Sequence, residues 1–267
     1  KSLPPESPAS WTELSFDDLA KLDRATVEAA QLAALKLRFE TFQDKIPALK
    51  TLIDKQGVTD IDSLAAALPL YFDHRVYKAY PLTLLEKRSF GPLTKWLDRL
   101  TTHDLSKMSL DGLTTVDSWL DRLDEYNMIV GHSTGTTGKL SFIPRSTTEW
   151  PAWKNAYFEA YSAATGGNDL RVKAYPSIST GYKYGHHMMI KINTRFAEAA
   201  AGGDINRYNF QSGKVSSDLM SLAGRLQAAE EKGELDSLKI DPSILAARAE
   251  LIAAGRTKDA DMAAWFA

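Results

Sequence analysis

The spacing of apolar residues changes partway along this chain of 267 residues. Apolar residues recur at helical intervals through residues 26–42 and again through 83–100. Two short apolar runs follow, at 128–130 and 140–144, and a segment rich in glycine and hydroxyl side chains lies between them. A helical bundle has no place for such an element. The pattern therefore predicts an α/β chain with a strand–loop–strand element in its middle.

We expect a helix-rich N-terminal region at residues 1–125, an α/β core at 126–203 and a helical tail at 204–267, together forming one large domain. Ser15 and Thr115 are predicted to begin helices as N-caps. The other predicted helices lie at 26–42, 62–68, 83–100, 117–123, 149–164, 184–201 and most of 216–265. The predicted strands are short and lie at 128–130, 140–144 and 170–175.

Composition excludes several kinds of site. The chain has no cysteine, which excludes disulfides, thiolate metal sites and a cysteine nucleophile. Its formal net charge is -2, unlike the basic footprint of a nucleic-acid binder. No apolar run approaches the roughly 20 residues that cross a bilayer, and the polar residues 1–10 do not resemble a signal peptide. We therefore expect a cytoplasmic protein with no membrane span and no nucleic-acid partner.

The segment between the two apolar runs has the residue types that hold phosphate. Its glycines let the backbone approach a ligand closely, its hydroxyls offer hydrogen-bond donors, and its lysine adds a positive charge. The predicted phosphate-binding residues are Ser133, Thr134, Gly135, Thr136, Thr137, Gly138 and Lys139. A ligand-free hairpin rich in serine, threonine and glycine is the alternative interpretation of the same residues.

The P-loop of common nucleotide hydrolases does not fit this segment. That motif needs a glycine five residues before Gly138, where Ser133 stands, and a serine or threonine after Lys139, where Leu140 stands. A helix should follow the motif, whereas the next residues are predicted to form a strand. The glycine fingerprint of dinucleotide-binding folds is also absent here.

The segment instead resembles the signature loop of adenylate-forming enzymes, a superfamily of acyl- and aryl-CoA ligases, luciferases and peptide-synthetase adenylation domains. Residues 133–138 match that loop in order. Leu140 stands where proline is usual and Ser141 where lysine is usual, and Lys139 either substitutes for that lysine or faces solvent. The continuation is similar to the phenylacetate–CoA ligase, acyl-protein synthetase and plant hormone amido synthetase branches. The resemblance is specific over the loop and weak elsewhere.

The resemblance implies that the loop grips the β- and γ-phosphates of ATP, with Mg²⁺ as cofactor. A carboxylic acid substrate would attack the α-phosphorus, pyrophosphate would leave, and the acyl adenylate would pass to coenzyme A, an amine or a protein. The family's magnesium-binding Glu, ribose-binding Asp and catalytic Lys are not found in this chain, so no catalytic residue is assigned. We therefore expect the N-terminal portion of a longer enzyme or a truncated form, completed by a C-terminal domain or by homo-oligomerisation.

A second segment, residues 175–187, is rich in glycine and aromatic side chains. The same resemblance implies an acyl pocket there, lined by Tyr182, Tyr184, Gly185 and His186, and an ordinary strand-to-helix turn is the alternative. We predict no metal at His186 and His187, because neighbouring residues on a helix point about 100° apart. No acidic residue lies one helical turn further on, where Ile190 and Lys191 stand.

Two other functions remain open from the sequence. A non-catalytic nucleotide- or anion-binding module would keep the loop without the chemistry, and a helical interaction protein would carry the loop incidentally. A serine hydrolase does not fit, because no G-x-S-x-G elbow surrounds Ser133, Ser177 or Ser179.

Overall fold

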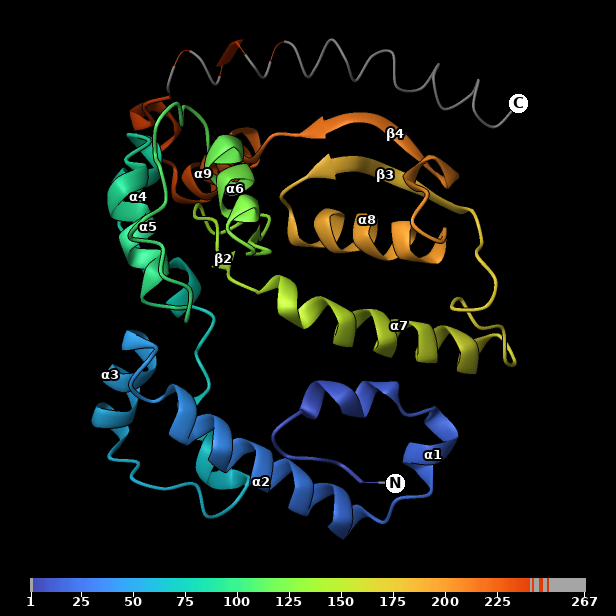
Figure 1. Cartoon of the computed structure of the whole chain (residues 1–267). Helices are drawn as coiled ribbons and strands as arrows, with labels where there is room; N and C mark the ends of the chain where they lie inside the picture. The colour runs from blue at the N-terminus through green and yellow to red at the C-terminus, as the bar shows by residue number, and fades with distance from the viewer. Residues whose placement is uncertain (1, 241, 243–244, 247–248, 250–267) are drawn as a thin grey trace. The chain divides into compact units, whose positions relative to one another are not determined.

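The computed structural model describes residues 2–240, 242, 245–246 and 249, and it is a mixed α/β structure, as predicted (Figure 1). The predicted helix at 216–265 lies partly outside these residues. The helices are α1 (Phe16–Ala20), α2 (Arg24–Phe42), α3 (Pro47–Gln56), α4 (Leu82–Glu86), α5 (Phe90–Asp98), α6 (Val116–Glu125), α7 (Trp150–Ala164), α8 (Met188–Ala200) and α9 (Ser217–Lys232). The strands are β1 (Gly131–His132), β2 (Phe142–Ile143), β3 (Ser177–Gly185) and β4 (Tyr208–Val215).

The chain divides into two compact units, each made from separated segments. The first unit comprises Lys1–Asp73, Pro92–Ser109 and Ser146–Lys173, and the second comprises His74–Gly91, Leu110–Arg145 and Ala174–Ala267. In the first unit, α7 packs against α1 and against the 3₁₀ turn Pro8–Glu13. The loop and the proposed acyl pocket predicted from the sequence both lie in the second unit.

Helix α6 contributes much of the core of the second unit. Thr115 begins it with a capping box, in which the Thr115 side chain accepts from Ser118 N–H and the Ser118 side chain accepts from Thr115 N–H, so that prediction is confirmed. Its Trp119 is fully buried and meets the ring of Phe142 edge-on, with 5.2 Å between ring centroids. One side of α6 is thereby fixed against β2.

Strands β3 and β4 pair in parallel, with Ser177 opposite Tyr208 and Gly185 opposite Val215. Helix α8 connects them and packs against β3, as Figure 1 shows. Parallel strands need such a crossover connection, which explains why a helix separates two strands that lie side by side.

Strands β1 and β2 form a hairpin around the glycine-rich loop, but the first strand is Gly131–His132 and not the predicted segment 128–130. Gly131 pairs with Ile143 and His132 with Phe142. The loop between them packs closely against α9. A Cβ atom built on Gly224 of α9 would lie only 2.0 Å from the carbonyl oxygen of Gly135. Glycine at position 224 therefore permits the close approach of the loop to the helix.

Several predicted elements need correction. The predicted helix at 83–100 is two helices, because Arg88 adopts a positive φ of 51° between α4 and α5. The segment 170–175 is not the predicted strand but a turn followed by irregular chain, in which Asp169 accepts from the N–H of Arg171, and β3 begins only at Ser177. The predicted helix at 184–201 begins only at Met188, after β3. The tail at 204–267 is not wholly helical, since β4 lies within it.

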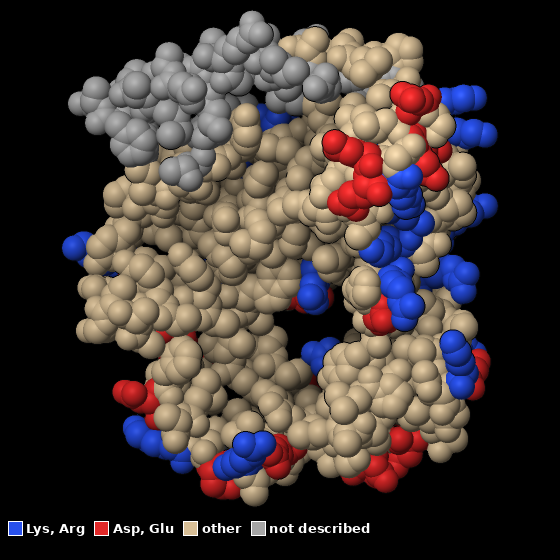
Figure 2. Space-filling model, turned by 180° about the vertical axis from the view of Figure 1, so that it is seen from behind, with Lys and Arg blue, Asp and Glu red and all other residues tan. Residues whose placement is uncertain are grey.

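Among the described residues, no helix combines the length and apolar character that a membrane crossing requires. On the face shown in Figure 2, lysine and arginine side chains lie among aspartate and glutamate side chains rather than in one large basic area.

The contact between the loop and α9 makes a testable prediction at Gly224. Alanine normally stabilises a helix by about 1 kcal/mol relative to glycine. We expect Gly224→Ala to have the opposite sign and to lower the unfolding free energy by about 1–3 kcal/mol, because its Cβ meets a backbone carbonyl. Urea unfolding of both proteins measures the difference.

Gly91→Ala is the matched control, because a Cβ on this glycine of α5 would make an ordinary 3.5 Å contact with Leu110. Gly91→Ala should be neutral or stabilising. Stabilisation by Gly224→Ala as well would show that the loop does not press on α9.

Candidate functional site

The glycine-rich loop forms a tight turn at the end of the hairpin. Ser133 N–H donates to Ser141 O at 3.0 Å, and Gly138 N–H donates to Gly135 O at 2.8 Å. Gly135 and Gly138 have φ values of 72° and 82°, a region that L side chains rarely adopt. The glycines thus fix the shape of the turn.

The turn presents polar groups to solvent. Thr134, Thr136 and Thr137 are exposed. Among the residues that the structure describes, none accepts a hydrogen bond from the backbone N–H of these three threonines. Exposed N–H and hydroxyl donors in one turn are the groups that bind an oxyanion.

Two lysines flank the turn. The Nζ atom of Lys78 lies 3.2 Å from Thr137 Oγ1. Lys139 donates to Tyr80 O and lies 4.4 Å from the centroid of the Tyr80 ring, while the Tyr80 hydroxyl donates to Leu140 O at 2.8 Å. Burial, and secondly the charge of Lys78, lower the pKa of Lys139. Both ammonium groups therefore lie in a region where an anion would be stabilised.

His132 of β1, just before the turn, forms a hydrogen-bonded cluster with Ser217 of α9 and Asp117 of α6. The Nδ1 atom of His132 lies 2.8 Å from Ser133 O, and its Nε2 atom lies 2.9 Å from Ser217 Oγ. Ser217 Oγ also lies 2.7 Å from Asp117 Oδ1. Because a carbonyl oxygen can only accept, Nδ1 carries the proton of the neutral ring, and the hydroxyl of Ser217 donates its single proton to Asp117.

This cluster is not a hydrolase triad. In such a triad the carboxylate orients the histidine, whereas Asp117 here contacts the serine. Ser217 is also completely buried. The cluster instead holds the hairpin to the first turn of α9.

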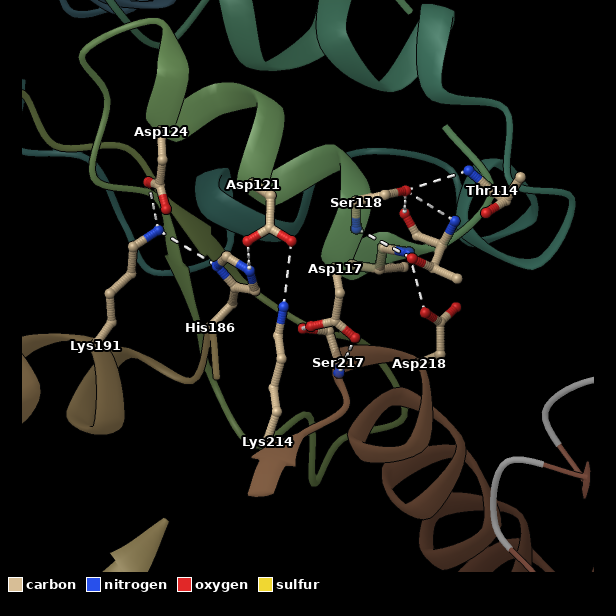
Figure 3. Close-up of polar contacts among 12 residues, drawn as sticks. Thr114, Asp117, Ser118, Asp121, Asp124, His186, Lys191, Lys214, Ser217 and Asp218 are labelled. Carbon is tan, nitrogen blue, oxygen red and sulfur yellow. Dashed lines mark hydrogen bonds and ion pairs between the residues drawn. The ribbon is translucent and has the colours of Figure 1, made fainter. Parts of the chain in front are cut away.

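Helix α6 carries a row of three carboxylates, Asp117, Asp121 and Asp124, each directed at a different part of the unit (Figure 3). Asp121 Oδ1 lies 2.8 Å from His186 Nε2, and its Oδ2 lies 3.2 Å from the Nζ atom of Lys214. Asp124 Oδ1 lies 2.6 Å from the Nζ atom of Lys191.

The buried ammonium of Lys191 sets the proton positions in this group. It donates to Val130 O at 2.9 Å and lies 3.3 Å from His186 Nδ1. Since ammonium can only donate, Nδ1 accepts, and Nε2–H donates to Asp121. Burial, and secondly the charge of Lys191, lower the pKa of His186 to about 4. Burial also raises the pKa of Asp124 and lowers that of Lys191. The attraction between the two charges shifts each pKa in the opposite direction but has the smaller effect.

Asp121, Asp124 and His186 lie close enough to be considered as metal ligands, with ligand atoms within 4.8 Å of one another. Lys191 contacts Asp124 and His186, and Lys214 contacts Asp121. A divalent ion would have to displace these ammonium groups, so the arrangement does not fit a metal.

Three of the four residues that were predicted to line an acyl pocket lie around one cavity. Tyr184, Gly185 and His186 line a cavity of about 300 Å³, and Tyr182 is not among its lining residues. Many of the residues that line the cavity are charged, and these are Asp121, Asp124, Lys183, Lys191, Arg195 and Lys214.

Lys78 and the carboxylates of α6 were not predicted from the sequence. The spacing of Asp117, Asp121 and Asp124 by four and three residues, which places them on one side of a helix, was a usable signal. Their partners were not visible in the sequence, because Asp121 and His186 are 65 residues apart.

No protein-family model, no curated protein and no solved structure matches this chain.

The buried His132 predicts a loss of stability in acid. Burial lowers its pKa from 6.5 to about 4, so the unfolded chain binds this proton first. The unfolding free energy should therefore fall as the pH drops from about 6.5 to 4, by at most about 3 kcal/mol from this residue. Urea unfolding at a series of pH values measures the slope.

His132→Asn should have a smaller slope, and some dependence should remain because the pKa of His186 is lowered too. The exposed His74 provides the control, His74→Asn, which should keep the full slope. An equal slope in wild type and His132→Asn would show that His132 is not buried in its neutral form.

Proposed function

We propose that the loop of residues 133–139 binds the β- and γ-phosphates of ATP, and that the chain belongs to an ATP-dependent enzyme that activates carboxylic acids by forming acyl adenylates. The observation that carries the proposal is the exposed turn at Thr136 and Thr137, with the ammonium group of Lys78 beside Thr137 and a second lysine, Lys139, at the end of the loop. The resemblance of the loop sequence to adenylate-forming enzymes supplies the reaction.

The charges around the turn support a phosphate ligand. Burial lowers the pKa of Lys139, and repulsion by the charge of Lys78 lowers it further. No hydrogen bond or ion pair joins the loop to a carboxylate within the described part of the chain. An anion at the turn would offset this repulsion, and a polyphosphate has the largest charge among common small ligands.

The donors of the turn suit the departing group of the reaction. As the carboxylate oxygen attacks the α-phosphorus, the bond to the β-phosphate bridging oxygen breaks and negative charge accumulates on pyrophosphate. Preorganised N–H and hydroxyl donors stabilise such charge without reorganising during the step. Thr136 and Thr137 are proposed to supply these donors, and Lys78 to stabilise the terminal phosphate.

Magnesium is expected to arrive with the nucleotide. The turn offers it hydroxyl and carbonyl oxygens, whereas Asp121 and Asp124 on α6 are already paired with lysines. Bound Mg²⁺ would neutralise further charge on the phosphates. The acceptor of the acyl group is proposed to be coenzyme A, an amine or a protein, and the proposed location is the cytoplasm, where ATP is supplied.

ATP–pyrophosphate exchange tests the proposal, using Mg²⁺ and a pool of fatty and aromatic acids. We expect acid-dependent exchange in the wild type and a loss of about 10²–10³-fold in Thr137→Ala, because one donor to the departing charge is removed. Thr114→Ala is the matched control, since Thr114 is exposed in the same unit and lies outside the loop.

Binding of ATP is measured separately by calorimetry. Lys78→Met should weaken ATP binding by about 10–100-fold, the usual effect of losing one charged hydrogen bond. Lys232→Met, at the exposed end of α9, should leave it unchanged. Binding without exchange would favour a non-catalytic nucleotide-binding module, and equal binding by wild type and Lys78→Met would contradict the proposed site.

A further inference from the structure

The cavity beside α6 carries more positive than negative charge. Its lining includes four cationic side chains, from Lys183, Lys191, Arg195 and Lys214, and two carboxylates, from Asp121 and Asp124. The surplus among these described lining residues is two positive charges when all six groups are ionised. Strands β3 and β4 and helices α6 and α8 supply these residues, so the cavity is built from the folded core of the unit.

The carboxylates are already engaged by other partners. Asp124 pairs with Lys191, and Asp121 accepts from both Lys214 and His186. Lys191 has only 7 % of its side chain exposed and donates to Val130 O as well. These contacts leave the two carboxylates directed toward Lys191, Lys214 and His186 rather than toward Lys183.

Lys183 has a different environment. Its Nζ atom donates to Ile205 O at 3.0 Å and lies 5.1 Å from the centroid of the Phe210 ring. Within the described part of the chain it makes no ion pair with a carboxylate. A backbone carbonyl and an aromatic face orient an ammonium group without neutralising it. Lys183 therefore lines the cavity as a positioned cation.

The geometry points to a binding site for a small dianion in this cavity, either a dicarboxylate or a phosphate monoester. Two negative charges match the surplus of the lining, and a volume of about 300 Å³ lies at the lower end of the usual range for ligand pockets. Lys183 binds one acidic group, and Lys214, on the paired strand β4, binds the second in place of its contact with Asp121. This site is separate from the loop residues, and its occupancy does not require ATP.

Calorimetry on the full chain without ATP tests the site, with succinate, phenyl phosphate and the monoanion propionate as probes. We expect each dianion to bind at least about tenfold more tightly than propionate, because the second charge meets the second cation. The tighter of the two dianions identifies the ligand as a dicarboxylate or a phosphate monoester. Phenyl phosphate is also titrated into Lys78→Met, which separates binding in the cavity from binding at the loop.

Two variants should change dianion affinity in opposite directions. Lys183→Met should weaken it about tenfold, and Lys183→Arg should largely retain it. Asp121→Asn should strengthen it several-fold, because removal of one negative charge increases the surplus and releases Lys214. Partial unfolding would not increase affinity. Asp121→Asn therefore still tests the site if Lys183→Met folds poorly. Lys232→Met is the control for a lysine outside the cavity.

Equal affinity for succinate, phenyl phosphate and propionate would overturn the inference, as would dianion binding that neither Lys183→Met nor Asp121→Asn alters. Binding of Zn²⁺ or Mg²⁺ that Asp121→Asn abolishes, without dianion binding, would assign a cation to the cavity and also overturn it. Because no arm uses ATP, failure here leaves the proposed role of the loop intact, and failure of pyrophosphate exchange leaves this site intact.

Discussion

The row of carboxylates on α6 is the interaction on which the second unit depends. Asp117 binds the start of α9 through Ser217, Asp121 binds β4 through Lys214, and Asp124 binds α8 through Lys191. Two of these partners, Ser217 and Lys191, are buried. Removal of one carboxylate would leave its buried partner unsatisfied, which costs more than the intact pair contributes. One helix therefore sets the positions of three other elements, α8, α9 and β4.

The elements that could be predicted are those with local signals. The hairpin was predictable because two apolar runs flank Gly135 and Gly138, and the start of α6 was predictable from Thr115. The parallel pairing of β3 with β4 was not, because Ser177 and Tyr208 become neighbours only through tertiary packing. The helix predicted over 184–201 took in the end of β3, where Tyr184 and His186 continue an apolar pattern that suits either structure. Lys78 was missed because its contact with Thr137 spans 59 residues.

The loop and the cavity use positive charge in different ways. At the loop, Lys78 and Lys139 stand beside exposed donors of the backbone, an arrangement suited to the spread charge of a polyphosphate. In the cavity, Lys183 and Lys214 come from two paired strands, an arrangement suited to two separate acidic groups. The N–H of His132 donates to His186 O at 2.9 Å, so one peptide hydrogen bond connects the strand before the loop with the residue that lines the cavity.

The distances along the sequence between α6 and its partners also bear on how the protein is made. Asp117 and Ser217 are 100 residues apart, so at about 5–20 residues per second a ribosome needs about 5–20 s to supply the serine after the aspartate. Throughout that interval the acidic side of α6 has emerged without the partners that will cover it. The second unit can close only late in its own synthesis, because a nascent chain interrupted before Ser217 lacks both the partner of Asp117 and helix α9, which packs against α6.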